Sequence, residues 1–390
     1  MGIEEQGLRA LLREIVAIDS VNPSLVPGAR GEAEVAAHLR EFLRGHGIAA
    51  ELEEVAPGRP NVVALIGGGT APAAGAKPRA ALAVLAHMDT VGAGDMKDPF
   101  TPRERNGRLY GRGALDIKSG VAAMCAAAIA LCREHPRLAR PLLVAGVVDE
   151  EYNSAGAEAL LERYTADAAI VLEPTNLAVC VAHKGYAWFE VTTRGRAAHG
   201  SLPEEGRDAI RMMGRVLNLL DALDRKLAQQ APHPLLGHGS LHASLIRGGQ
   251  ELSSYPAECS LELERRTLPS ESEAGVEAEV RSLIEGLQQR DPEFRATARR
   301  LGARPPYEIS PDAPVAKAAV EAVREVTGAA HVTGMTAWTD TALLAAAGIP
   351  GVVFGPRGRG LHGAEEYVEL DSVTACAEVL YRLMARYCAA

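Results

Sequence analysis

The stretch ALAVLAHMDTV, residues 81–91, decides the fold, because six apolar residues run directly into a histidine, a methionine and an aspartate. An apolar run this short predicts a strand that is buried on both faces of a sheet. Similar runs recur at 141–148, 168–172 and 351–354. Helical patterns lie between these runs. Buried strands separated by helices predict an α/β fold with a mostly parallel sheet covered on both faces.

Further patterns complete this α/β part of the chain. Strands are expected at 50–54 and 61–66, and a loop rich in Gly, Ala and Pro at 67–78. The expected helices share an amphipathic or small-residue pattern and lie at 32–46, 120–133, 155–163, 312–327, 340–347 and 371–387.

A second pattern interrupts the first. Alternating strands are expected at 187–194, 240–247, 257–266 and 294–301, with helices at 206–229 and 271–289. The order β-α-β-β-α-β is typical of a small ferredoxin-like antiparallel sheet with two helices on one face. We therefore expect a catalytic domain in two parts, 1–184 and 302–390, and an inserted domain at 185–301.

Composition excludes several classes of protein. A net charge of −9 argues against a general binder of nucleic acid or anionic membranes. No signal peptide is recognisable, and no stretch approaches the about 18–20 apolar residues that a membrane span needs. The six cysteines form no CxxC pair, so buried free thiols in a reduced cytoplasm are expected.

Residues capable of chemistry follow the buried strands. His87 follows the first run, Glu150 and Glu151 the second, and Glu173 the third, while Asp116 precedes a helix. Ligands bind beyond the carboxyl ends of strands in open α/β sheets. Taken singly, each signal has an ordinary alternative, because a lone histidine is more often structural and an acidic pair is usually a solvated loop.

Taken together, the motifs resemble the M20 metallopeptidase family, in particular its acetylornithine deacetylase and succinyl-diaminopimelate desuccinylase branch. The resemblance covers residues from about 10 to 388. The matching segments are AHMDTV at 86–91, GRGALDIKSG at 111–120, DEE at 149–151, EPT at 173–175 and LHG at 361–363.

The resemblance implies a site for two divalent metal ions, zinc before cobalt or manganese. His87 and Glu173 would bind one ion and Asp116 would bridge both. Glu151 and His362 would bind the second.

The resemblance also implies catalytic roles. Glu150 would be the general base toward a metal-activated water, and Asp89 would orient the ligand His87. His199 would polarise the substrate carbonyl from the inserted domain; without the family it would read as an ordinary loop residue. Arg266 would contact a substrate carboxylate, or else pair with Glu262 or Glu264.

The expected function is hydrolysis of the amide bond of a small N-acyl amino acid by a homodimer that associates through the inserted domain. A dipeptidase or carboxypeptidase remains the alternative, as does a catalytically silent relative. Ser253 stands where many relatives carry asparagine, which weakens a precise transfer of substrate. Two other candidates fail: the glycines at 67–69 lack the residues of a phosphate loop, and Ser119 lacks a nucleophile elbow.

Overall fold

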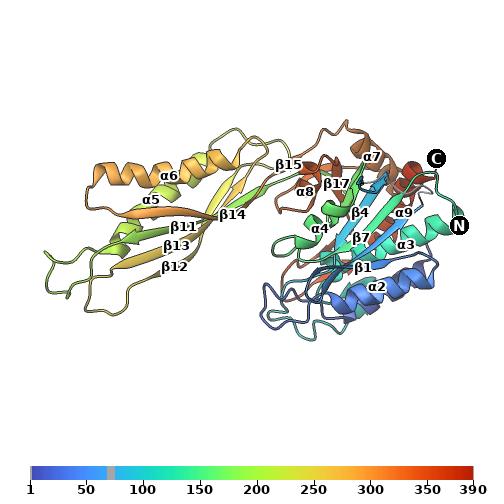
Figure 1. The fold of residues 1–390 in the computed structure, drawn as a ribbon, viewed down its shortest axis with the longest axis horizontal. Helices are drawn as coiled ribbons and strands as arrows, with labels where there is room; N and C mark the ends of the chain where they lie inside the picture. Colours follow the sequence, from blue (N-terminus) through green and yellow to red (C-terminus); the bar gives the residue numbers. More distant parts are fainter. Residues whose placement is uncertain (1, 68–74, 390) are drawn as a thin grey trace. The chain divides into compact units, whose positions relative to one another are not determined.

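The computed structural model describes residues 2–67 and 75–389, and its contacts divide the chain into two compact units (Figure 1). Unit 1 comprises Met1–Val181, Ile309–Thr333 and Thr339–Ala390. Unit 2 comprises Ala182–Glu308 and Gly334–Trp338, and the expected inserted domain falls inside it. Most of the expected loop at 67–78 lies outside the described residues.

The main sheet has a parallel centre, which confirms the expected α/β class. Its strands run in the order β1-β2-β7-β4-β9-β17-β10-β15, and β7, β4, β9 and β17 are mutually parallel. Antiparallel neighbours flank this centre on both sides. The bounds are β1 Glu51–Ala56, β2 Arg59–Ile66, β4 Leu82–His87, β7 Leu142–Val147, β9 Ala169–Leu172, β10 Val179–His183, β15 Tyr307–Glu308 and β17 Gly351–Phe354.

Helices cover both faces of the parallel centre, as its apolar strands require. Leu160 of α4 (Ala155–Arg163) and Leu344 of α8 (Thr341–Ala346) join the core on the face that contains Val171 of β9. On the opposite face, a side chain at Gly120 would touch Leu172, which places α3 (Ser119–Glu134) there. The other helices of unit 1 are α1 Glu5–Ala17, α2 Ala33–Gly45, α7 Pro314–Thr327 and α9 Leu370–Cys388.

One expectation about apolar stretches is wrong. The segment Ala114–Glu134 is long and apolar enough to cross a membrane, although 83% of its most apolar window is buried inside the fold. It packs against α1, α9 and the sheet, so its apolar composition is that of a core helix. No disulfide bond joins the cysteines in the described part of the chain, and five of the six cysteines are buried.

Several short strands were not expected, because runs of two to four residues show little periodicity. One group forms a four-stranded sheet in the order β18-β19-β6-β5. The bounds are β3 Arg79–Ala80, β5 Arg103–Arg105, β6 Arg108–Tyr110, β8 Thr165–Ala166, β16 Val332–Met335, β18 Gly358–Arg359 and β19 Tyr367–Glu369.

Unit 2 contains the expected β-α-β-β-α-β order. Its antiparallel sheet runs β12-β13-β11-β14, and residues of both helices pack on that sheet in one core. The bounds are β11 Gly185–Arg194, α5 Ala209–Ala228, β12 Ser240–Gly248, β13 Glu258–Thr267, α6 Glu273–Arg290 and β14 Ala296–Arg304. Helix α5 begins three residues later than expected, because the Asp208 carboxylate caps it by accepting from the Arg211 N–H at 2.9 Å.

Candidate metal centre

Three parallel strands end level with one another at one edge of the sheet. A histidine and three acidic residues lie at the ends of these strands. Strand β4 ends at His87, β7 leads into Glu150 and Glu151, and β9 leads into Glu173. His87 lies opposite Val147 of β7, and β4 is also in register with β9. The sheet thus brings these side chains together at the edge where α/β folds bind ligands.

Asp116 reaches the same place from a tight turn. It lies in the turn η1, Ala114–Lys118, where the Asp116–Ile117 peptide bond is cis. Gly113 precedes the turn with φ +78°, and a side chain there would come within 2.8 Å of Thr90. The Glu366 carboxylate accepts the Asp116 N–H at 3.1 Å and another N–H of the turn at 2.8 Å.

Five side chains form two triads that share Asp116. In the first triad, His87 Nε2 lies 3.3 Å from Asp116 Oδ1 and 3.7 Å from Glu173 Oε1. In the second, His362 Nε2 lies 3.3 Å from both Asp116 Oδ2 and Glu151 Oε2. The candidate ligand atoms of each triad lie within 4.8 Å of one another. Each oxygen of Asp116 therefore faces a different histidine, as would be required of a residue that bridges two ions.

The protonation tendencies of this cluster fit a divalent cation. Burial first, and then repulsion by Asp116, raises the pKa of Glu151. Glu151 Oε1 is buried and has no hydrogen-bond partner among the described residues. Hydrogen bonds to Asp116 and then Glu151 raise the pKa of His362 to about 10. Crowded acids that disfavour one another's charge are stabilised by a bound cation, and imidazole with carboxylate donors suits zinc.

Glu150 lies beside this cluster but belongs to neither triad. Burial first, and then the charge of Glu173, raises the pKa of Glu150 well above its usual range. A buried carboxylate with a raised pKa is a stronger proton acceptor than an ordinary surface acid, which is the property a general base needs.

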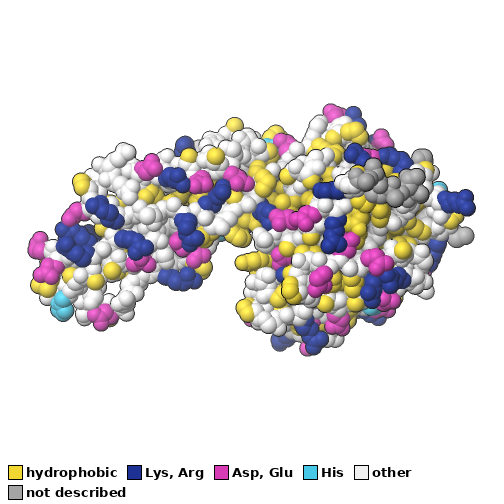
Figure 2. Space-filling view, viewed as in Figure 1, with side chains coloured by type: hydrophobic (Ala, Val, Ile, Leu, Met, Phe, Trp, Pro, Cys, Tyr) yellow, Lys and Arg dark blue, Asp and Glu magenta, His cyan; other side chains and the backbone are white. Residues whose placement is uncertain are grey.

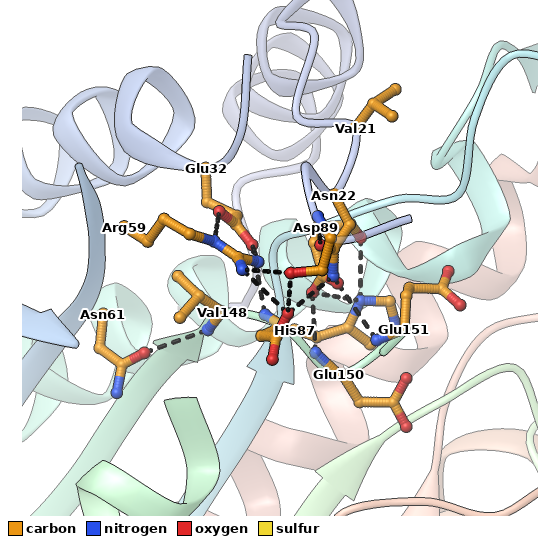
Figure 3. A network of polar contacts seen from close by, with 12 residues as sticks. Val21, Asn22, Glu32, Arg59, Asn61, His87, Asp89, Val148, Glu150 and Glu151 are labelled. Carbon is orange, nitrogen blue, oxygen red and sulfur yellow. Dashed lines mark hydrogen bonds and ion pairs between the residues drawn. The ribbon is translucent and has the colours of Figure 1, made fainter. Parts of the chain in front are cut away.

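Asp89 connects His87 to the two glutamates. Its Oδ1 lies 3.5 Å from His87 Nδ1, and its two oxygens accept the N–H groups of Glu150 and Glu151 at 3.1 Å each (Figure 3). Burial works to raise the pKa of Asp89, but the hydrogen bonds from His87 and Asn22 hold it below its usual value. Asp89 thus stays ionised beside the His87 ring, whose Nδ1 also lies 3.0 Å from the Asp89 main-chain oxygen.

The two other candidates lie in unit 2. His199 is on an exposed loop, where its Nδ1 lies 2.8 Å from Ser201 Oγ. Arg266 on β13 donates from Nε to Glu264 Oε1 at 2.6 Å, which is the ordinary pairing that the sequence left open. The roles of both residues in substrate binding stay predictions.

Sequence reasoning missed the charged side chains that support the site from behind. Arg112 and Glu366 are buried, and Arg112 Nη1 donates to Glu366 Oε2 at 2.8 Å. The half-buried Arg59 and the buried Glu32 form a second ion pair. The available signal was weak: Arg112 lies within the quoted glycine motif, while the other three stand in unremarkable polar segments.

A cavity of about 460 Å³ lies beside this support and is lined by none of the triad residues. Lys97, Arg105 and Glu366 are among its lining residues. Glu366 thus links this cavity to the metal centre, because its carboxylate accepts the Asp116 N–H.

Comparison with known proteins identifies a matching family profile and relatives of similar sequence. A family profile described as Peptidase family M20/M25/M40 matches residues 83–386. The chain is 32% identical to an acetylornithine deacetylase of Myxococcus xanthus, covering 98% of this chain and 97% of that one. It is 31% identical to a probable succinyl-diaminopimelate desuccinylase of Staphylococcus epidermidis, covering 68% and 69%.

A similar solved structure is that of a tripeptidase from Staphylococcus aureus. Its TM-score is 0.80 at 21% identity, with 99% of both chains covered. This likeness confirms the fold.

Proposed function

The chain belongs to peptidase family M20/M25/M40 as a metal-binding hydrolase, and from this premise we propose that it cleaves the amide bond of a small N-acyl amino acid. Family membership confirms the resemblance seen in the motifs around His87 and Asp116. The observation that carries the proposal is the pair of triads sharing Asp116, with the buried Glu150 beside them and outside both. Relatives named deacetylase and desuccinylase support N-acyl amino acids as the substrate class.

In this proposal, His87, Asp116 and Glu173 hold one ion, and Asp116, Glu151 and His362 hold a second. Nitrogen and carboxylate ligands without thiolate favour zinc, with cobalt or manganese as substitutes. Divalent ions bound there supply Lewis acidity toward the amide carbonyl and lower the pKa of water.

Glu150 performs the proton transfers of the reaction. Its carboxylate removes a proton from the attacking water while the water oxygen bonds to the carbonyl carbon. The protonated Glu150 then gives that proton to the nitrogen as the C–N bond breaks, which leaves an amine and a carboxylic acid. The acid then ionises and its proton passes to the amine, so that the products are a carboxylate and an ammonium ion. Asp89 holds the Glu150 main chain and the His87 ring in place throughout.

Unit 2 contributes the groups that recognise the substrate. His199 donates a hydrogen bond to the carbonyl oxygen as negative charge develops on it. Arg266 exchanges its contact with Glu264 for the substrate carboxylate, which its guanidinium fork matches in geometry.

A dipeptidase or carboxypeptidase is the second candidate. The similarity to a tripeptidase favours it, because the same residues would hydrolyse a peptide amide. A catalytically silent relative is disfavoured, because all five candidate ligands and Glu150 are present and brought together.

We also propose a cytoplasmic homodimer without nucleic-acid or membrane partners. The edge strand β12 of unit 2 exposes Leu245 and Ile246 by 49% and 55%, which suits pairing with a second copy. In the face that Figure 2 shows, basic and acidic side chains intermingle, and this does not favour a polyanion. Light scattering on the purified protein tests the dimer.

Turnover of a substrate panel by the zinc- or cobalt-loaded protein tests the activity. The panel contains N-acetyl and N-succinyl amino acids, unblocked dipeptides and C-terminally blocked controls. We expect the highest kcat/KM for an N-acyl amino acid with a free carboxylate. A preference for dipeptides would replace the deacylase assignment with the peptidase one, and metal-loaded protein inactive on every amide would overturn both.

A further inference from the structure

The turn that carries Glu150 and Glu151 is braced by a buried ion pair (Figure 3). Arg59 on β2 donates from Nη1 to Asp149 Oδ1 at 2.9 Å and from Nε to Glu32 Oε2 at 2.8 Å. The side chains of Arg59, Glu32 and Asp149 are exposed by 13%, 0% and 5%. One guanidinium therefore neutralises two buried carboxylates directly beside the metal centre.

The brace holds the main chain as well as the side chain of Asp149. Asp149 has a φ of +70°, a backbone conformation that residues other than glycine rarely adopt. Its N–H donates to Glu32 Oε1 at 3.2 Å, and its carbonyl accepts N–H groups of residues 152–154. A strained backbone of this kind persists only where the surroundings fix it from several sides.

Asn22 links the brace to the metal centre. Its Nδ2 donates to Asp149 Oδ1 at 3.1 Å and to Asp89 Oδ2 at 2.8 Å. Asp89 in turn accepts the N–H groups of Glu150 and Glu151. A continuous chain of hydrogen bonds thus runs from the ion pair to the two glutamates.

These contacts explain how adjacent glutamates take different directions. Figure 3 shows the side chains of Glu150 and Glu151 diverging from the fixed turn, and Glu151 alone joins a triad. We propose that Arg59, braced by Glu32, is a positioning residue that fixes this turn so that Glu151 reaches the metal ion while Glu150 stays free for proton transfer. The role given to Glu150 rests on the proposed function, whereas the role given to Glu151 concerns metal binding alone.

The test compares Arg59→Met with Arg386→Met. Arg386 likewise contacts two carboxylates in unit 1, Glu321 and Glu325, but these lie on α7 and outside the site. We expect Arg59→Met to weaken binding of the second zinc ion by about 10–100-fold and to lower kcat by a similar factor. KM should stay within about twofold, since the Arg59 guanidinium is bound to Glu32 and Asp149 and belongs to neither triad. The cobalt absorption spectrum should change in Arg59→Met and stay as in the parent in Arg386→Met.

Zinc titration without substrate separates this proposal from the proposed function. If no amide were hydrolysed, weakened zinc binding in Arg59→Met would still support the positioning role. If Arg59→Met lost only thermal stability, with zinc affinity and kcat within twofold of Arg386→Met, the proposal would be wrong.

Two milder variants serve if Arg59→Met does not fold. Arg59→Lys keeps the charge but loses the fork, and Asn22→Ala breaks the link to Asp89. Each should weaken binding of the second zinc ion by about tenfold. Zinc affinity equal to that of the parent protein in both variants would overturn the proposal.

Discussion

Two buried histidines, His87 in unit 1 and His183 in unit 2, have pKa values that are shifted in opposite directions. Both are almost fully inaccessible, at 3% and 0% exposure. Burial works to lower the pKa of His87, but Glu173, Asp116 and Asp89 hold it well above its ordinary value. Burial lowers the pKa of His183 to about 4. The hydrogen bond between His183 and the Lys184 carbonyl works to raise this pKa but does not offset the effect of burial. The charge of the neighbours, and not burial itself, decides the outcome.

The exposed histidines also differ in their neighbours. His362 is 54% exposed, and its bonds to Asp116 and Glu151 still raise its pKa to about 10. His199 contacts the Ser201 hydroxyl instead. The exposed histidine of unit 1 thus lies between two carboxylates, whereas that of unit 2 contacts a hydroxyl group.

The largest effect on turnover is expected from Glu150, which lies beside the two triads and belongs to neither. Glu150→Gln should lower kcat by about 10²–10⁴-fold, because the amide cannot accept the proton of water. Zinc affinity should change little. Steady-state kinetics and zinc titration measure the two effects, with the exposed Glu162→Gln on α4 as control. Turnover within about tenfold of the parent would remove Glu150 from the role of base.

A smaller effect is expected from the exposed histidine of unit 2. His199→Ala should lower kcat by about 10²–10³-fold, as loss of one donor to a developing oxyanion does. Zinc affinity should not change, which distinguishes this variant from loss of a ligand. The exposed His331→Ala is the control, and a kcat equal to that of the control would show that unit 2 supplies no such donor.

Arg266 should affect binding more than chemistry. Arg266→Lys keeps the charge but loses the bidentate fork, so KM should rise about tenfold while kcat stays within about twofold. The measurement compares an N-acyl amino acid with its carboxamide analogue, which lacks the carboxylate. An equal rise in KM for both would mean that Arg266 serves only its pairing with Glu264.

The smallest effect concerns stability and His183. Its folded pKa of about 4 lies below the ordinary value of 6.5, so folding favours the neutral ring. The contribution of the neutral His183 ring to the free energy of unfolding is complete above about pH 6.5 and declines as the pH falls toward 4. Between pH 7 and 5.5 the loss should be about 1 kcal/mol.

Urea unfolding of the parent and of His183→Phe at both pH values measures this contribution. Phenylalanine keeps the ring contacts with Tyr307 and Trp338 but does not titrate. An equal pH dependence in the two proteins would contradict the assignment.

Much of the fold could be predicted because local pattern and burial agree. The strands β4, β7 and β9 lie buried on both faces and read as apolar runs, and α4 was expected at its observed bounds. The β-α-β-β-α-β order of unit 2 followed from alternation in the same way. Strand β10 was not expected, and only Lys184 separates it from β11.

The supporting residues of the site could not be predicted in this way. Glu366 holds Asp116 across 250 residues, and Arg59 reaches Asp149 across 90. A hydrogen bond between distant segments leaves no periodic signal near either residue. The positive φ of Asp149 depends on such contacts, so no local pattern in the sequence predicts it.

The sequence by itself determined the order of elements and the acids and histidines that follow the strands, because both depend on neighbours along the chain. Only the tertiary structure decided that His87, Asp116 and His362 meet, that Asp116 offers one oxygen to each histidine, and that Arg266 pairs with Glu264. It also set the opposite pKa shifts of His87 and His183, because electrostatic energies depend on distance in space and not on separation along the chain.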